Sequence, residues 1–184
     1  MIAAAFAESA ALVKAWGEAH GAELERAAAV MSAALANGGK VLSFGNGGSA
    51  GDAQHLAGEL VGRYLKDRQA LAAMALTTDT GILTAVGNDF GFDAVFSRQI
   101  EALGRTGDVA FGITTSGASA NVTRALKTAR DRGMTTIALT GRDGGETGRA
   151  VDVHLNVPSN STPRVQEVHR TILHVLCELI EKDL

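Results

Sequence analysis

The sequence predicts an α/β fold, a three-layer sandwich in which helices flank a central parallel sheet and an N-terminal helical segment precedes it. Five short apolar runs recur along the chain, and segments with helical periodicity separate most of them. Such runs are typical of strands covered by helices on both faces. With 184 residues and 46% hydrophobic composition, we expect one domain, with helices over 1–38 and the sheet core and C-terminal helix over 39–184.

Helices are expected first, over residues 2–19 and 22–37. Both segments are rich in Ala, Leu and Glu, and their apolar residues recur at helical spacing. The sequence Asn37-Gly38-Gly39 then predicts a helix end, because glycine readily adopts the left-handed conformation found there.

The strands of the sheet are expected at the five apolar runs, and a long helix should close the chain. The helix is predicted from about Arg164 to Glu181, where apolar residues again recur every three or four positions. The runs are Val41–Phe44, Leu71–Leu76, Val109–Ile113, Thr135–Leu139 and Val153–Val157.

Charge and cysteine content narrow the classes of partner. The chain has 17 basic and 20 acidic residues, a net charge of −3, so nucleic acid and anionic membrane surfaces are not expected partners. Cys177 is the single cysteine, and its apolar neighbours predict a buried thiol in a reducing compartment. The N-terminus lacks the pattern of a signal peptide, and we expect a cytoplasmic protein.

A glycine-rich turn, Gly45-Asn46-Gly47-Gly48-Ser49, follows the first expected strand. Ligands of doubly wound sheets bind beyond the carboxyl ends of the strands, and the free N–H groups of a helix start favour an anion. Ser49 is expected to cap the following helix. The turn matches neither a P-loop nor the dinucleotide fingerprint, and a tight turn without a ligand remains the alternative.

A second turn after a buried strand carries four hydroxyls in six residues. Thr114, Thr115, Ser116 and Ser119 lie where the Val109–Ile113 run ends. Hydroxyls and helix N-terminal N–H groups can bind a phosphate without a lysine. The alternative is a polar turn in which Ser119 only caps a helix.

His55 and Glu59 follow the glycine turn at a spacing of four residues, which places both on one face of a helix. That arrangement suits a shared metal ion, although an ordinary structural pair would have the same spacing. Near the other end of the chain, Gln166 and His174 are eight residues apart, about 12 Å along a straight helix. Both reach one ion only if Gln166 lies at or before the helix start, or if different subunits supply them.

Several spaced motifs together give the chain a specific resemblance. It resembles the bacterial sedoheptulose 7-phosphate isomerases of the sugar isomerase (SIS) family from about residue 39 onward. The resemblance implies a single SIS domain over 1–184, a homotetramer with sites near subunit interfaces, and a sugar-phosphate substrate. The motifs are Gly45-Asn46-Gly47-Gly48-Ser49, Asp52-Ala53-Gln54-His55, Gly87-Asn88-Asp89, Thr115-Ser116-Gly117, Leu139-Thr140-Gly141 and Gln166-Glu167-x-His169.

The activity implied is conversion of sedoheptulose 7-phosphate to D-glycero-D-manno-heptose 7-phosphate, an early step towards the heptose of lipopolysaccharide. The resemblance places a zinc ion, one per subunit, at His55, Glu59, Gln166 and His174. It places substrate contacts at Asn46, Gly47, Gly48, Asn88, Asp89, Thr114, Thr115, Ser116, Ser119 and Gln166, to which we add Ser49 and Glu59.

Aldose–ketose isomerisation moves a proton between neighbouring carbons through an enediol, which requires a base, an acid and stabilisation of negative charge. Glu59 and His174 are the predicted catalytic pair. A carboxylate held tightly by zinc is a poor base, so we expect the contact between Glu59 and the metal to be labile.

Two non-enzymatic classes share the framework. One is a tetrameric SIS protein that binds a replication initiator, and its relatives lack the residues corresponding to Glu59 and His174. The other is a phosphosugar-sensing domain, which is usually fused to a DNA-binding segment.

Overall fold

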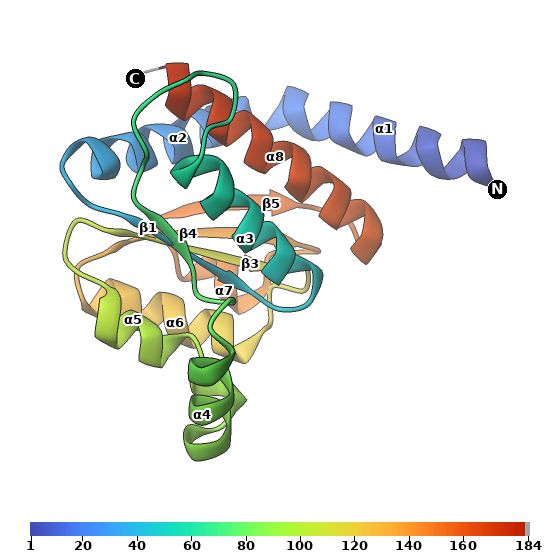
Figure 1. Cartoon of the computed structure of the whole chain (residues 1–184). Coiled ribbons are helices and arrows are strands. Elements are labelled where there is room, and N and C mark those ends of the chain that lie inside the picture. Colours follow the sequence, from blue (N-terminus) through green and yellow to red (C-terminus); the bar gives the residue numbers. More distant parts are fainter. Residues whose placement is uncertain (183–184) are drawn as a thin grey trace.

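The computed structural model describes residues 1–182. A helical pair opens the chain, and five strands then alternate with helices (Figure 1). The order is α1 (Ile2–Ala19), α2 (Gly21–Ala36), β1 (Val41–Gly45), α3 (Gly48–Val61), β2 (Ala73–Ala75), α4 (Thr80–Phe90), the 3-10 helix η1 (Phe92–Ala94), α5 (Ser97–Leu103), β3 (Val109–Thr114), α6 (Ala120–Asp131), β4 (Thr135–Gly141), α7 (Gly145–Arg149), β5 (Val153–Val157) and α8 (Thr162–Lys182).

The five strands form one parallel sheet in the order β2-β1-β3-β4-β5. The order reverses between β1 and β3, where Gly45 pairs with Ile113. Connections from these two strands leave the sheet in opposite directions, so a crevice opens beyond their carboxyl ends. The glycine turn after β1 and the hydroxyl turn after β3 both begin at this crevice.

Helices cover both faces of the sheet, as predicted. Side chains of successive strand residues point to opposite faces, so Val109, Phe111 and Ile113 pack with α1, α2, α3 and α8. Leu42, Phe44 and Ala110 belong to the second core with α5 and α6. Figure 1 shows the two helical layers on either side of the strands.

Two details of the sequence prediction were wrong. The edge strand β2 covers only Ala73–Ala75 of the predicted run. At the start of the run, the amide of Leu71 donates to the carbonyl of Leu60 at the end of α3 (3.0 Å) instead of entering the ladder. Ser49 does not cap α3. The N-cap is Gly47, with φ 57°, and Ser49 is buried inside the first turn.

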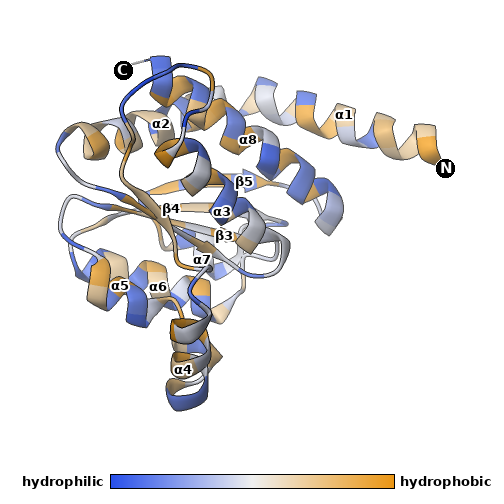
Figure 2. Cartoon of the chain, in the orientation of Figure 1, coloured by the Kyte–Doolittle hydropathy of each residue, from blue (hydrophilic) through white to orange (hydrophobic). Residues whose placement is uncertain are grey.

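Parts of two helices extend from the sheet layers with little cover. The start of α1 projects from the molecule and carries Ile2 and Phe6, which are 78% and 75% exposed (Figure 2). No residue of α4 is buried, and Phe90 at its end is 57% exposed. Within residues 1–182, no helix is both long and apolar enough to cross a membrane.

Candidate active site

The glycine turn and the hydroxyl turn are linked directly by two asparagines. The amides of Asn46 and Asn121 exchange two hydrogen bonds, at 2.8 and 3.0 Å. Sequence reasoning placed Asn46 in the site and missed Asn121, which is 3% exposed at the start of α6. An asparagine at the start of a helix that follows a ligand-type turn is the sequence signal that could have found Asn121, although it does not indicate the pairing with Asn46.

Three of the predicted hydroxyls converge at the carboxyl end of β3. Thr114 Oγ1 lies 3.2 Å from Ser116 Oγ and 2.8 Å from Ser119 Oγ. Ser119 occupies the N-cap position of α6, but its hydroxyl makes no cap hydrogen bond. The alternative in which Ser119 only caps the helix is therefore confirmed for its position, but its hydroxyl makes no cap bond. The helix start keeps N–H donors for an anion.

The short helix α7 supports the hydroxyl turn from behind. Thr147 donates to the carbonyl of Gly117 from its amide (3.1 Å) and its hydroxyl (2.9 Å). Gly117 has φ +66°, and a Cβ there would lie 2.4 Å from the backbone of Gly144. Only glycine fits this close approach, so the shape of the turn depends on the backbone of α7.

The second half of the site lies between α3 and α8, which run side by side in the same direction (Figure 1). Their contacts follow helical spacing. Gln166 packs against Gly48, where a Cβ would lie 2.3 Å from the amide nitrogen. One turn on, Arg170 pairs with Asp52 at 2.7 Å.

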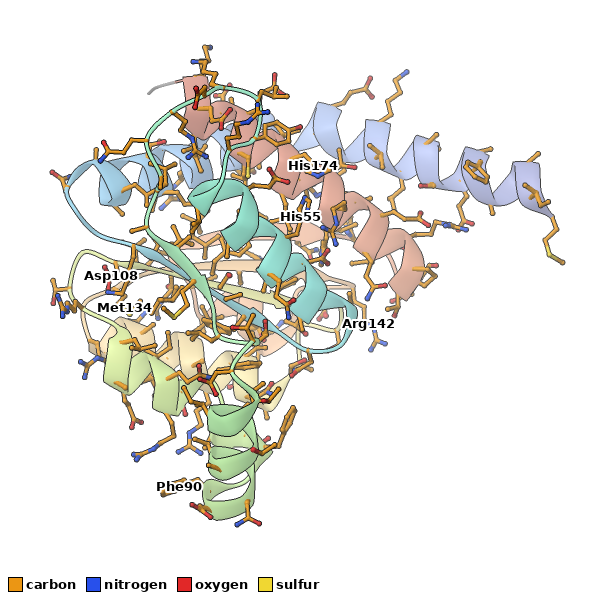
Figure 3. The ribbon with its side chains drawn as sticks, viewed as in Figure 1. His55, Phe90, Asp108, Met134, Arg142 and His174 are labelled. Atoms are coloured by element: carbon orange, nitrogen blue, oxygen red, sulfur yellow. The ribbon has the colours of Figure 1, made fainter. Side chains whose placement is uncertain are left out.

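His55 and His174 meet at the next turn of the two helices, and both point into the same space (Figure 3). Their Nε2 atoms are 2.8 Å apart, so one ring donates and the other accepts. His55 Nε2 also lies 3.4 Å from Glu59 Oε1. The side chains of His55 and Glu59 are 30% and 23% exposed, which leaves them open to a substrate.

The charge state of His55 follows from its surroundings. Burial lowers its pKa, and the cation of Arg170 lowers it further, while Glu59 opposes the shift. His55 is therefore neutral at pH 7, with one N–H group and one nitrogen lone pair, and one of the two is used at Nε2 in the contact with His174.

His55, Glu59 and His174 form a trio whose donor types suit zinc. Among residues 1–182, no three His, Cys, Asp or Glu side chains already form a metal site. Two nitrogen ligands of one zinc ion lie roughly 3.3 Å apart in tetrahedral geometry, so the imidazoles would need to separate by a few tenths of an ångström. Two imidazoles and one carboxylate then form a chemically suitable set.

The fourth predicted ligand does not reach this trio within one chain. Gln166 lies inside α8 and contacts Gly48, two helical turns before His55 on α3. It faces an open cleft of about 600 Å³ between α1, α3 and α8 that also contains Asp52 and Arg170. Burial raises the pKa of the Asp52 carboxyl, and its partner Arg170 opposes that shift.

Asn88 and Asp89 lie far from the trio. Both are exposed on α4, and their side chains bond to each other at 2.8 Å. Phe90, the next residue, marks the opposite end of the molecule from His55 and His174 in Figure 3. One chain therefore brings the glycine turn and the hydroxyl turn together. It separately brings together the His55–Glu59–His174 trio. It does not bring all the predicted site residues to one place.

His169, on the same helix as His174, has a structural role. It is fully buried, and its Nε2 donates to the carbonyl of Thr140 at 2.9 Å. Burial lowers its pKa to about 4, against a smaller opposing effect of the Thr140 bond.

Comparison with known proteins adds a family model and close relatives. The model of the SIS domain matches residues 6–141. A phosphoheptose isomerase of Aquifex aeolicus is 56% identical over 177 residues, which are 96% of this chain and 93% of that protein.

Two solved structures agree with the fold over nearly the whole chain. The phosphoheptose isomerase of Neisseria gonorrhoeae superposes with a TM-score of 0.94 at 50% identity, covering 98% of this chain and 97% of that one. The phosphoheptose isomerase of Francisella tularensis gives 0.95 at 40% identity, covering 98% and 96%.

Proposed function

The chain belongs to the phosphoheptose isomerases of the SIS domain family, and from this membership we infer that it converts sedoheptulose 7-phosphate to D-glycero-D-manno-heptose 7-phosphate. The reaction is an early step in making the heptose of lipopolysaccharide. The observation that carries this conclusion is 56% identity over 96% of the chain.

We propose that Glu59 and His174 move the protons. Glu59 takes the proton from C1 of the ketose while His174 donates one to O2, which gives the enediol. The aldose forms when the enediol hydroxyl at C1 loses its proton to His174 and Glu59 returns a proton to C2. The close approach of His55, Glu59 and His174 supports these roles, since acid and base must both reach the same two adjacent carbons and their oxygens.

The phosphate of the substrate is assigned to the hydroxyl turn. Thr114, Ser116 and Ser119 offer three converging hydroxyls, and the N-terminus of α6 adds partial positive charge. Asn46, held by Asn121, lies beside that turn and is suited to bind sugar hydroxyls.

Zinc is part of the proposal because of the donor set. His55, Glu59 and His174 would hold the ion, which when bound polarises the substrate carbonyl as a Lewis acid. Enzyme freed of metal by a chelator should lose most of its activity and regain it with added zinc. Full activity with chelator present throughout would refute the Lewis-acid role.

We also propose a homotetramer whose sites are completed at subunit interfaces. Gln166, Asn88 and Asp89 lie away from the trio within one chain, whereas α4 has no buried residue and the start of α1 exposes Ile2 and Phe6. A neighbouring copy that covers these helices could bring the missing residues to the trio. A cytoplasmic location fits the single cysteine, Cys177, a buried thiol whose pKa is raised to about 12 by burial and by nearby carboxylates.

The test is an isomerase assay on purified protein. Incubation with sedoheptulose 7-phosphate should give the aldose, detected by NMR or by a coupled kinase. Binding of the phosphosugar without turnover would instead support the sensing or initiator-binding classes.

A further inference from the structure

The strap of residues 62–68, which follows α3, is fixed by one buried carboxylate on α8. Glu181 is 3% exposed and accepts hydrogen bonds from the amides of Tyr64 (2.8 Å), Leu65 (2.8 Å) and Lys66 (2.9 Å). Figure 1 shows the strap arching past the C-terminal end of α8. Burial alone would raise the pKa of Glu181, but these amides and Arg68 hold it at about 2, so the carboxylate is ionised.

Arg68 joins this carboxylate to the end of α3. Its Nε lies 3.1 Å from Glu181 Oε1, and its Nη atoms donate to the carbonyls of Glu59 (2.8 Å) and Leu60 (2.9 Å). The two side chains are 9% and 3% exposed. The pair therefore connects the last turn of α3, which carries Glu59, to the last turn of α8.

Tyr64 is the strap residue that contacts His174, the proposed acid. Its ring stacks on the imidazole of His174, with centroids 5.6 Å apart and planes at 26°. His174 also contacts His55, with the two Nε2 atoms 2.8 Å apart. The imidazole thus has one aromatic stacking partner and one hydrogen-bonding partner.

We propose that the strap is a positioning element for the reaction. In this arrangement, Glu181 and Arg68 fix the strap, and the Tyr64 ring holds His174 in the orientation that faces His55 and Glu59. Buried ion pairs contribute little net stability when compared with apolar replacements. Their best-supported benefit is a single defined conformation, and here that conformation sets the geometry of two proton-transferring groups. The inference rests on the proposed role of His174.

Substitutions at Tyr64 test the ring. Tyr64→Ala should lower kcat roughly ten- to a hundredfold with little change in KM, because misplacing a catalytic group slows the chemical step more than it weakens binding. Tyr64→Phe keeps the ring and should retain kcat close to that of the wild type. Leu65→Ala, at a neighbouring strap residue that is 64% exposed, is the matched control and should leave kcat unchanged.

Assays well below the melting temperature separate positioning from folding. A purely structural Tyr64 would show a lower melting temperature in Tyr64→Ala but an unchanged kcat, and that result would overturn the proposal. An equal loss in Tyr64→Phe would also overturn it, because the hydroxyl and not the stacked ring would then be required.

Glu181→Gln tests the anchor. It keeps the size of the side chain but removes the charge and one acceptor, so the strap should loosen and kcat should fall in the same direction as in Tyr64→Ala, again with KM nearly unchanged. Unchanged kcat in folded Glu181→Gln would refute the anchoring role. Wild-type protein inactive on sedoheptulose 7-phosphate would instead refute the proposed function itself, so the two failures are distinguishable.

Discussion

At the scale of residues, the proposed chemistry depends on how closely Glu59, His55 and His174 approach one another. The carboxylate lies 3.4 Å from His55, and His55 lies 2.8 Å from His174. Burial favours the neutral form of His55, and this imidazole contacts both Glu59 and His174. The three side chains therefore act as one unit, and changes to them should not be additive.

Replacing Glu59 tests the assigned base. Glu59→Gln should lower kcat about 10²- to 10⁴-fold, the usual contribution of a general base. The KM should change little, because the hydroxyl turn is proposed to supply most of the substrate binding. Steady-state kinetics with sedoheptulose 7-phosphate measures both. Glu101→Gln makes the same chemical change on α5, against the opposite face of the sheet, and should behave as the wild type.

His169 predicts a pH dependence of stability. Its pKa is about 4 in the folded protein and about 6.5 unfolded, so the unfolded state binds more protons between these values. Its contribution is thus complete above pH 6.5 and is lost as the pH falls towards 4. From pH 7 to pH 5 the free energy of unfolding should drop by about 2 kcal/mol because of this group.

Urea denaturation of wild type and His169→Gln at both pH values, at fixed protein concentration, measures this effect. The variant should lose about 2 kcal/mol less between pH 7 and pH 5. His55 and His154, whose pKa values are also lowered by burial, contribute equally to both proteins. Identical pH profiles would show that His169 can be protonated in the folded state.

At the scale of elements, local patterns predicted what depends on neighbours in sequence. The strands after residue 40 and the final helix come from runs of apolar residues and helical periodicity, so their positions, apart from the ends of β2, followed from the chain alone. Contacts between distant segments could not be predicted this way. The Glu181–Arg68 pair joins residues 113 positions apart, and the Asn46–Asn121 pair spans 75, so nothing in local sequence indicates either one.

The same limit applies to the boundaries of the site. Spacing placed His55 and Glu59 on one helix face, but their encounter with His174 depends on the alignment of α3 with α8. Two glycines set part of the site geometry. Gly48 lets Gln166 of α8 approach α3, and Gly117 lets the hydroxyl turn approach Gly144. Their role is steric, and a glycine in a sequence does not reveal which backbone it approaches.

Gly117 gives a prediction for the hydroxyl turn as an element. Gly117→Ala adds a methyl group 2.4 Å from the backbone of Gly144 at φ +66°, so the turn must shift. We expect a loss of at least about 1–3 kcal/mol in stability and a raised KM for the sugar phosphate.

The matched control is Gly38→Ala. Gly38 also has a left-handed backbone, with φ +80°, but a Cβ there meets no atom within 4 Å. This variant should lose only about 1 kcal/mol and keep its KM. Urea denaturation and steady-state kinetics on both variants measure the difference, and an unchanged KM in Gly117→Ala would argue against phosphate binding at this turn.

At the scale of the whole molecule, one chain forms two partial sites. The crevice at the sheet reversal holds the glycine turn and the hydroxyl turn. The His55–Glu59–His174 trio lies further along α3 and α8. Apolar side chains on α1 and α4 remain exposed, among them Phe6 and Phe90. Large exposed apolar residues on projecting helices are typical of surfaces that pack against another subunit, and a symmetric assembly would bury them in every copy.

Mixing two inactive variants tests whether neighbouring subunits share a site. Glu59→Gln removes the base, and Gln166→Ala removes the predicted ligand that its own chain cannot bring to the trio. Unfolding and refolding the two together at equal amounts gives assemblies with random subunit composition.

If each site takes Glu59 from one subunit and Gln166 from another, roughly a quarter of the sites receive both native residues, and the mixture should recover about that fraction of wild-type activity. If one chain supplies both residues, every site keeps a defect and the mixture stays inactive. Wild-type protein refolded in the same way is the control, because its recovery sets the activity against which the mixture is compared.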